Sequence, residues 1–268
     1  MAKLHSTLAF TGTLDSLSFY SRSDSDGIFV RRKGGPTKKM IKTKKQFDIT
    51  RRINAEFGGR ATAAKHIMNA LRPLKPLGDY NIAGPLNAML KPIQSLDTQN
   101  EYGQRSVCIS ENLKMLEGFN LNRKNPFDSI IRSPLEFTLS KEGLSAQVTV
   151  PALMPGFNFF APPSRQPLYS FVISGGVIPD LFYTPQGYKP ADGYENFRSE
   201  AAWSAWHPVV KGSPETVLQL DLKHEVMELP GSAFSMMMAI GICFGTVGEG
   251  QEPMPVKYAG AAKVLGMR

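Results

Sequence analysis

Positive charge is concentrated between residues 31 and 52, which read RRKGGPTKKMIKTKKQFDITRR. This stretch holds ten Lys or Arg and one acid, Asp48, so its net charge is +9, whereas the whole chain carries +8. Ammonium and guanidinium groups at this density bind anions, either the phosphates of a nucleic acid or the carboxylates of a protein surface. A near-neutral body with one basic segment is typical of an arm that meets an acidic partner; the alternative is a solvated run of charge.

The electrostatic candidates are basic side chains inside this stretch. They are Lys38, Lys39, Lys42, Lys44, Lys45, Arg51 and Arg52. The only aromatic residue between Arg31 and Arg52 is Phe47, so stacking of bases is poorly provided for. The pattern therefore permits sequence-independent contact with nucleic acid and does not favour base recognition.

Patterns of catalytic, metal-binding or cofactor-binding residues are not found elsewhere in the sequence. The four histidines lie at no metal-ligand spacing from one another. Cys108 and Cys243 form no C-x-x-C pair and fit a reducing compartment. Residues 34–38, GGPTK, are similar to a phosphate loop but lack its first glycine. We therefore predict that the protein is not an enzyme and has no catalytic residue, cofactor or metal.

The chain ahead of the basic stretch is predicted to be extended. Residues 10–32 contain two strand-like runs separated by a polar turn that ends at Gly27, which indicates a small hairpin. Two strands alone bury too little apolar surface, so the hairpin must pack on the body or on a neighbouring molecule. The candidate assembly contacts are Phe19, Tyr20, Phe29, Val30, Arg31 and Arg32.

Two helices are predicted after the arm. The first runs from about Gln46 to Arg72, after a capping box at Thr43 and Gln46. Its apolar face is formed by Ile49, Ile53, Phe57, Ala61, Ala64, Met68 and Leu71. Compared with two alanines, Gly58-Gly59 lowers the stability of the helix by roughly 2 kcal/mol. Either the helix breaks at this pair, or another backbone packs closely on the glycines. The second helix runs from Pro85 to Leu96, with Pro92 as a kink.

The remainder is predicted to be rich in antiparallel strands. Residues 106–122 indicate a strand, a turn and another strand, and residues 135–150 a clear hairpin. A strand pair is expected around Gly175-Gly176, and residues 217–222 alternate strictly. The apolar run 233–247 indicates a buried central strand, and residues 256–268 a last one.

The predicted fold class is α+β, in three parts. These are an extended basic N-terminal arm with short strands (1–45), a short helical region (46–98) and an antiparallel β-sandwich or jelly-roll-like body (99–268).

Several short motifs occur in a fixed order along the chain. Gly12-Thr13-Leu14 precedes Phe29-Val30-Arg31-Arg32, and an Arg-containing helix follows from Thr43 to Arg52. The C-terminal half ends with the strand 239–247, the loop 248–256 and Tyr258-Ala259-Gly260. This order resembles a family of uncharacterised proteins of Bacteroidota and their mobile elements. The resemblance implies a fold and a bacterial or phage setting, and it implies no activity.

The leading functional prediction is a non-enzymatic structural subunit that self-assembles with copies of itself into a filament, tube, shell or phage particle. The alternative is a nucleic-acid-binding or packaging protein that acts through residues 31–52. A third hypothesis is a β-sandwich ligand-binding module; ordinary packing is the competing explanation for its aromatic residues. These residues are Trp203, Trp206, Tyr183, Tyr188 and Tyr194.

The location of the protein is predicted from its apolar segments. No stretch approaches the ~20 apolar residues of a membrane span, so no membrane insertion is expected. The N-terminus lacks the pattern of a signal peptide, so we expect synthesis in the cytoplasm, with incorporation into a virion or signal-independent release as alternatives.

Overall fold

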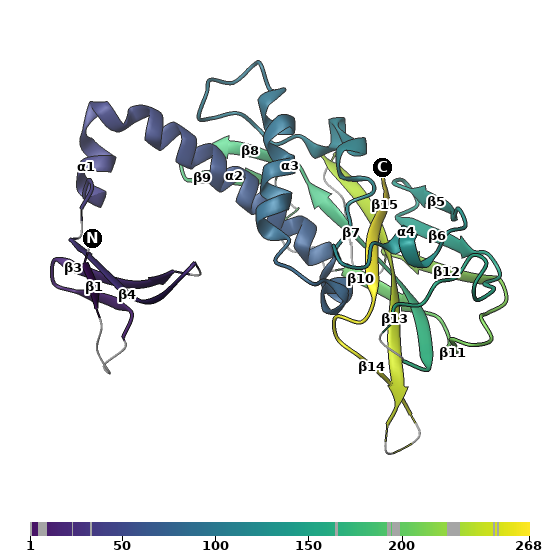
Figure 1. Ribbon diagram of the computed structural model, residues 1–268. Helices are drawn as coiled ribbons and strands as arrows, with labels where there is room; N and C mark the ends of the chain where they lie inside the picture. The colour runs from purple at the N-terminus through teal and green to yellow at the C-terminus, as the bar shows by residue number, and fades with distance from the viewer. Residues whose placement is uncertain are drawn as a thin grey trace. The chain divides into compact units, whose positions relative to one another are not determined.

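The computed structural model describes residues 2–4, 10–22, 24–32, 34–163, 166–191, 194, 199–223, 231–248, 250 and 252–268. The chain divides into two compact units, Met1–Arg51 and Arg52–Arg268. Figure 1 shows both units and labels most of their helices and strands.

Four antiparallel strands form a sheet at the start of the N-terminal unit. They are β1 (Ala2–Leu4), β2 (Gly12–Leu14), β3 (Leu17–Arg22) and β4 (Ser25–Arg32). The predicted hairpin is confirmed as the β3–β4 pair. The order across the sheet is β1-β4-β3-β2, so β1 and β2 extend the hairpin on both sides and form its edges.

A short helix follows the sheet and ends where a capping box was predicted. This helix, α1 (Lys38–Thr43), is capped by Thr37, whose Oγ1 accepts a hydrogen bond from Met40 N at 3.2 Å. The predicted capping box is wrong, because Thr43 is the last residue of α1 and its hydroxyl donates to Lys39 O. Thr37, directly after the Gly-Pro segment, caps this short helix and not the long helix that the box was predicted to start.

The long helix α2 (Asp48–Ala70) confirms the first predicted helix. It follows a 3-10 turn over Lys45–Phe47 and runs unbroken through Gly58-Gly59. A Cβ atom added to Gly59 would lie 2.7 Å from the Tyr188 ring, whereas one added to Gly58 would meet no atom within 4 Å. The close neighbour at this glycine pair is therefore an aromatic side chain and not the predicted backbone.

The predicted apolar face of α2 is covered over only half of its length. Ala64, and Leu71 directly after the helix, are buried. Ile49, Ile53 and Phe57 are 67%, 46% and 56% exposed and Ala61 is exposed too, so the expectation of one packed face is wrong from Ile49 to Ala61. Periodicity shows which side chains share a face, but only the neighbouring elements decide whether that face is covered.

Further helical segments lie in the C-terminal unit. The predicted second helix is confirmed as α3 (Ala83–Ser95), with Pro92 inside it. The predicted strands over residues 106–122 are wrong, because this segment forms the 3-10 turns Ile109–Glu111 and Leu113–Leu116. Single bridges, Val107 with Leu181 and Asn120 with Lys263, and backbone hydrogen bonds to Ala262 and Val264 join it to sheet residues. A short helix, α4 (Phe127–Ile130), comes next.

In the described part of the C-terminal unit, three antiparallel sheets follow. The largest contains β7 (Leu168–Pro179), β10 (Ser199–Trp203), β11 (His207–Pro208), β13 (Phe234–Val247), β14 (Pro253–Pro255) and β15 (Ala261–Met267). The second, in the order β12-β6-β5, contains β5 (Glu136–Ser140), β6 (Ser145–Val150) and β12 (Thr216–Asp221). The smallest pairs β8 (Leu181–Thr184) with β9 (Gly187–Pro190). The predicted hairpin over 135–150 and the predicted strands at 217–222, 233–247 and the C-terminus are confirmed.

The strand pair predicted around Gly175-Gly176 is wrong, because β7 passes through both glycines as one strand of 12 residues. Gly175 does not turn the chain. A Cβ atom there would lie 3.1 Å from Met237 O and 3.2 Å from Leu220 Cδ1. The glycine therefore lets β7 lie close to both β13 and the three-stranded sheet.

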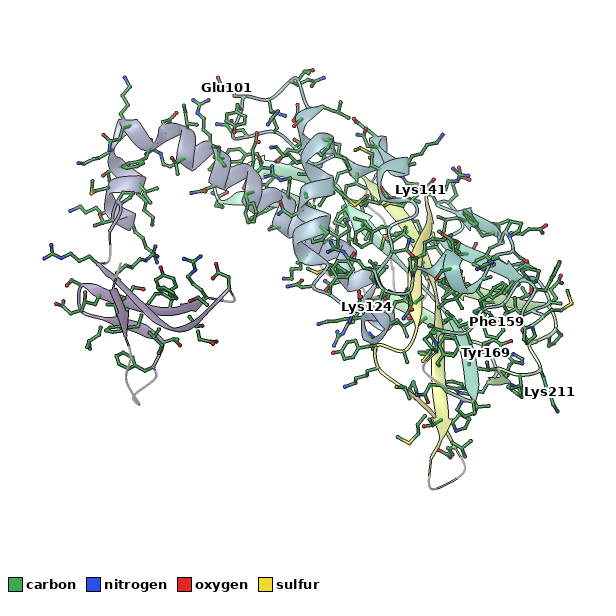
Figure 2. The ribbon with its side chains drawn as sticks, in the orientation of Figure 1. Glu101, Lys124, Lys141, Phe159, Tyr169 and Lys211 are labelled. Carbon is green, nitrogen blue, oxygen red and sulfur yellow. The ribbon has the colours of Figure 1, made fainter. Side chains whose placement is uncertain are left out.

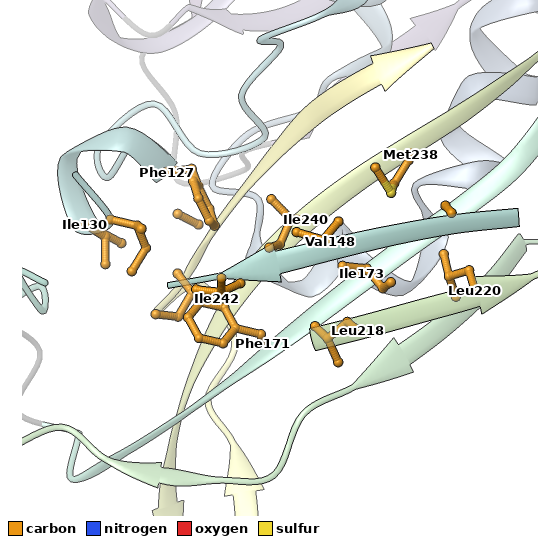
Figure 3. Close-up of a cluster of buried hydrophobic side chains, with 14 of the residues drawn as sticks. Phe127, Ile130, Val148, Phe171, Ile173, Leu218, Leu220, Met238, Ile240 and Ile242 are labelled. Atoms are coloured by element: carbon orange, nitrogen blue, oxygen red, sulfur yellow. The ribbon is translucent and has the colours of Figure 1, made fainter. Parts of the chain in front are cut away.

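Strands β7 and β13 are buried on both faces of the large sheet. Alternate residues of β13, such as Met238, Ile240 and Ile242, pack with the three-stranded sheet, and the residues between them, such as Ala239 and Cys243, pack with the helices. Figure 3 shows the first of these clusters, with Val148 of β6 and Leu218 and Leu220 of β12 facing Phe171, Ile173 and Ile240. Burial on both faces explains why residues 233–247 form a continuous apolar run.

The chain is therefore an α+β protein with antiparallel sheets. Among the described residues, no helix is both long enough and apolar enough to cross a membrane.

Candidate assembly interface

The N-terminal sheet brings the six predicted contact residues together on β3 and β4. Phe19 lies opposite Val30, Tyr20 opposite Phe29, and Leu17 opposite Arg32. Since successive residues of a strand point to opposite faces, Phe19 and Val30 lie on one face and Tyr20 and Phe29 on the other. The predicted contacts therefore occupy both faces of one sheet.

One face of this sheet is apolar and largely open to solvent. It carries Phe19, Val30 and the cross-strand pair Leu14–Leu17, in which the two leucines are 62% and 38% exposed. Phe10 adds a ring 4.5 Å from the ring of Phe19. Arg32, opposite Leu17, lies on the same face and is exposed. We call the apolar residues of this face, with Ile28, the apolar face of the N-terminal sheet.

The opposite face combines aromatic rings with guanidinium groups. The rings of Tyr20 and Phe29 are 6.0 Å apart. Arg31 lies over Tyr20 with its Cζ 5.3 Å from the ring centre, and Arg22 lies over Phe29 at 5.4 Å. Arg22 also forms an ion pair with Asp24. Cation–π contacts hold these cations over the rings, so this face is positively charged and better hydrated than the apolar one.

The N-terminal sheet has almost no core within its own unit. Among side chains that the structure describes between residues 10 and 51, only Ile28 is buried, and it is 8% exposed. A sheet of this size needs a covered apolar face to be stable in water. Within the described part of its own unit, the apolar face is therefore largely uncovered.

The five predicted lysines surround α1 and all of them are exposed. Lys38, Lys39 and Lys42 lie on α1, and Lys44 and Lys45 lie in the turn that follows. None of the five takes part in an ion pair within the described part of the chain. Their charge is thus available to an external anion.

The two predicted arginines are engaged in local contacts. Arg51 donates to the carbonyl oxygens of Ile41 at 2.8 Å and Lys44 at 2.9 Å, and it pairs with Asp48 at 3.1 Å. It therefore ties the end of α1 to the start of α2.

Arg52 makes comparable contacts inside the C-terminal unit. Its Nη1 donates to Tyr102 O at 3.2 Å and lies 3.7 Å from Glu101 Oε2. Both arginines support the fold as well as adding charge.

Sequence reasoning missed Leu14, Leu17 and Phe10 as members of the apolar face. Leu14 and Leu17 flank the tight turn at Asp15-Ser16, so the signal was a leucine on either side of a two-residue turn. Phe10 lies outside the strands and carried no periodic signal.

The five aromatic residues of the ligand-binding hypothesis do not all reach the surface. Trp203 is 50% and Tyr183 37% exposed, but Tyr194 is fully buried. Trp206 and Tyr188 pack against the helix-side core. Tyr194 cannot contribute to a surface platform, because its side chain is buried.

The two cysteine thiols lie in environments that raise their pKa values. Burial, followed by the charges of Asp180, Glu111 and Asp97, raises the pKa of Cys108 to about 12. Burial raises the pKa of Cys243 to about 11. Both thiols are therefore protonated at neutral pH and poor nucleophiles. Among the described residues, no group of three or more His, Cys, Asp or Glu could hold a metal ion.

Comparison with known proteins adds no relative to this description. No protein-family model matches the chain, and neither a curated protein nor a solved structure matches it. The resemblance to Bacteroidota proteins therefore stays a prediction.

Proposed function

We propose that this protein is a non-enzymatic structural subunit that self-assembles through its N-terminal sheet. The observation that carries the proposal is the apolar face, which exposes Leu14, Leu17 and Phe10 and has one buried side chain, Ile28. Exposed apolar surface of this kind marks an interaction site.

The charge of the sheet favours a second copy of this chain as the partner. Residues 2–32 contain four Lys or Arg and three Asp, a net charge of +1, so two sheets repel each other only weakly. Two apolar faces pressed together keep both cationic faces in water. The edges β1 and β2 offer backbone groups for strand addition, which extends such a contact into a larger assembly.

The test is a pair of substitutions on the apolar face, Leu14→Lys with Leu17→Lys. Both side chains are exposed, so the isolated chain tolerates them, while two lysines in a buried contact are unfavourable. The matched control is Thr13→Lys on the same strand, since Thr13 points to the opposite face. Size-exclusion chromatography with light scattering should show an assembly for the wild type and the control and a smaller species for the double variant. A monomeric wild type, or an unchanged double variant, refutes the proposal.

Nucleic-acid binding is the second candidate function, and the five exposed, unpaired lysines around α1 favour it. It predicts co-purifying nucleic acid and binding that weakens steeply with salt. The triple variant Lys38→Gln, Lys39→Gln and Lys42→Gln removes three charges. The slope of log affinity against log salt concentration for oligonucleotide binding should then fall by the amount expected for about three phosphate contacts. A preparation free of nucleic acid, with no oligonucleotide binding at low salt, rejects this function.

The finer description of the body as a β-sandwich or jelly roll belongs with these proposals. It is supported by the cluster shared between the large sheet and the three-stranded sheet.

A further inference from the structure

Two adjoining cavities lie in the C-terminal unit where α2 ends. One has a volume of about 540 Å³ and the other about 570 Å³. Arg72, Lys75, Gly78 and Tyr80 line both cavities, so the two adjoin. These volumes lie within the range of small-molecule sites in proteins. We call the cavity of about 540 Å³ the Tyr258 pocket, after a tyrosine that lines it.

The Tyr258 pocket is positively charged. Arg72, Lys75 and Lys257 line it, are exposed, and form no ion pair with any carboxylate of the described chain. Its one lining acid, Asp79, accepts hydrogen bonds from the backbone N–H groups of Arg123 and Lys124. The Asp79 carboxylate is thus occupied by backbone N–H groups, and the three cations have no carboxylate partner in the described chain.

Two tyrosines give the same pocket aromatic walls. Tyr80 is fixed, because its hydroxyl donates to Asn120 O at 2.8 Å and Arg123 stacks on its ring at 4.0 Å. Tyr258 is 64% exposed, so its ring is open to a ligand. The pocket therefore combines unpaired cations with a free aromatic surface.

The backbone at Tyr258 is held in an uncommon conformation. Its φ of 63° lies in the left-handed region, which a tyrosine rarely adopts. The turn is secured by a hydrogen bond from Tyr258 N to Pro76 O at 2.9 Å. Buried Asn122 donates to both Leu77 O and Gly260 O. Strain that neighbouring structure maintains in this way is found preferentially at functional sites.

We propose that the Tyr258 pocket binds a nucleotide, either free or within a single strand. The cations Arg72, Lys75 and Lys257 contact its phosphate, and the ring of Tyr258 stacks on its base. Both contacts are available without rearrangement of the fold. This site is independent of the proposed assembly through the N-terminal sheet and of the lysines around α1.

The test uses the full-length protein and adenosine 5′-monophosphate as the probe, in isothermal titration calorimetry at about 50 mM NaCl. Adenosine and inorganic phosphate are titrated separately. We expect the monophosphate to bind at least about tenfold more tightly than either fragment, because phosphate contact and ring stacking act together.

Two variants assign the binding to this pocket. Lys75→Gln and Tyr258→Gly should each weaken the binding of the monophosphate by about tenfold. Glycine adopts a positive φ without strain, so Tyr258→Gly removes the ring and leaves the turn intact. The control is Lys211→Gln, an exposed lysine at a different place on the body, labelled in Figure 2.

Fluorescence anisotropy with a labelled oligothymidylate of about ten nucleotides separates the two sources of the ligand. Loss of its binding in Tyr258→Gly assigns the pocket to a single strand. Loss of monophosphate binding alone assigns it to a free nucleotide. The proposal is overturned by failure of both probes to bind, by inorganic phosphate binding as tightly as the monophosphate, or by unchanged affinities in both variants.

Discussion

Glu56 of α2 holds a buried ion pair whose removal is expected to destabilise the C-terminal unit by about 3 kcal/mol. Its carboxylate accepts hydrogen bonds from Gly103 N at 2.9 Å and from Arg105 Nε and Nη2, both at 2.7 Å. The side chain is only 4% exposed, and Arg60 Nη1 lies 4.0 Å away. Glu56 therefore joins α2 to the loop that follows α3.

The magnitude follows from the geometry of this pair. Removing one partner of a buried ion pair costs about 3–5 kcal/mol, because the other charge is left uncompensated. Glu56→Gln keeps one carbonyl acceptor for Arg105, so the lower end of that range applies. Arg105 and Arg60 are 20% and 10% exposed, so water relieves little of the loss.

The assay is urea denaturation at neutral pH, with Glu101→Gln as the matched control. Glu101, labelled in Figure 2, is 77% exposed and its Oε2 lies 3.7 Å from Arg52 Nη1. Exposed pairs contribute about 0–1 kcal/mol, so the control should lie within that amount of the wild type. A Glu56→Gln protein as stable as the control refutes the reasoning.

The same variant should show a defined pH dependence. Burial raises the pKa of Glu56, but hydrogen bonds from Arg105 and Gly103 and the charges of Arg105 and Arg60 outweigh it and hold the pKa below the usual 4.5. A carboxyl whose folded pKa is depressed contributes stability above its unfolded pKa and loses it as the pH falls through the folded pKa. The stability difference between wild type and Glu56→Gln should therefore shrink below about pH 4.5. A difference that stays constant through that range contradicts this assignment.

Two further predictions concern small side chains. Gly58→Ala should stabilise the protein by about 1 kcal/mol through helix propensity, whereas Gly59→Ala should destabilise it by about 1–2 kcal/mol because its Cβ overlaps the Tyr188 ring. Thermal unfolding measured on the two variants side by side checks this, and shifts of the same sign would contradict it. Cys108 and Cys243 should resist iodoacetamide at pH ~8 in the folded protein and react after denaturation, as intact mass shows, because burial raises both pKa values. Rapid labelling of either thiol in the folded state would show that its site is open.

Local patterns predicted much of the secondary structure. The hairpin over 135–150 and the strand at 217–222 follow from alternation, and α2 and α3 from helical spacing. The failures occurred where the pattern is short or ambiguous. Residues 106–122 meet the sheets through single bridges and scattered backbone hydrogen bonds and form no strand. A glycine pair in β7 marks close packing instead of a turn.

The sequence predicted some residues of the candidate interface but not the full set. Phe19, Tyr20, Phe29 and Val30 were expected from the hairpin pattern, and β3 and β4 bring them together. Leu14 joined them because β2 and β3 form a second tight hairpin through Asp15-Ser16. With only three residues, β2 is too short to show a clear alternation in the sequence.

The sequence by itself determined where the charge lies, which segments alternate and which side chains share a face, because these depend on residue type and on the period of the backbone. Tertiary structure alone decided which of those faces are covered. It buried the charged Glu56 and Arg60 and left the apolar Phe57 exposed on the same helix. Coverage depends on contacts between segments far apart in the chain, and no local pattern encodes them.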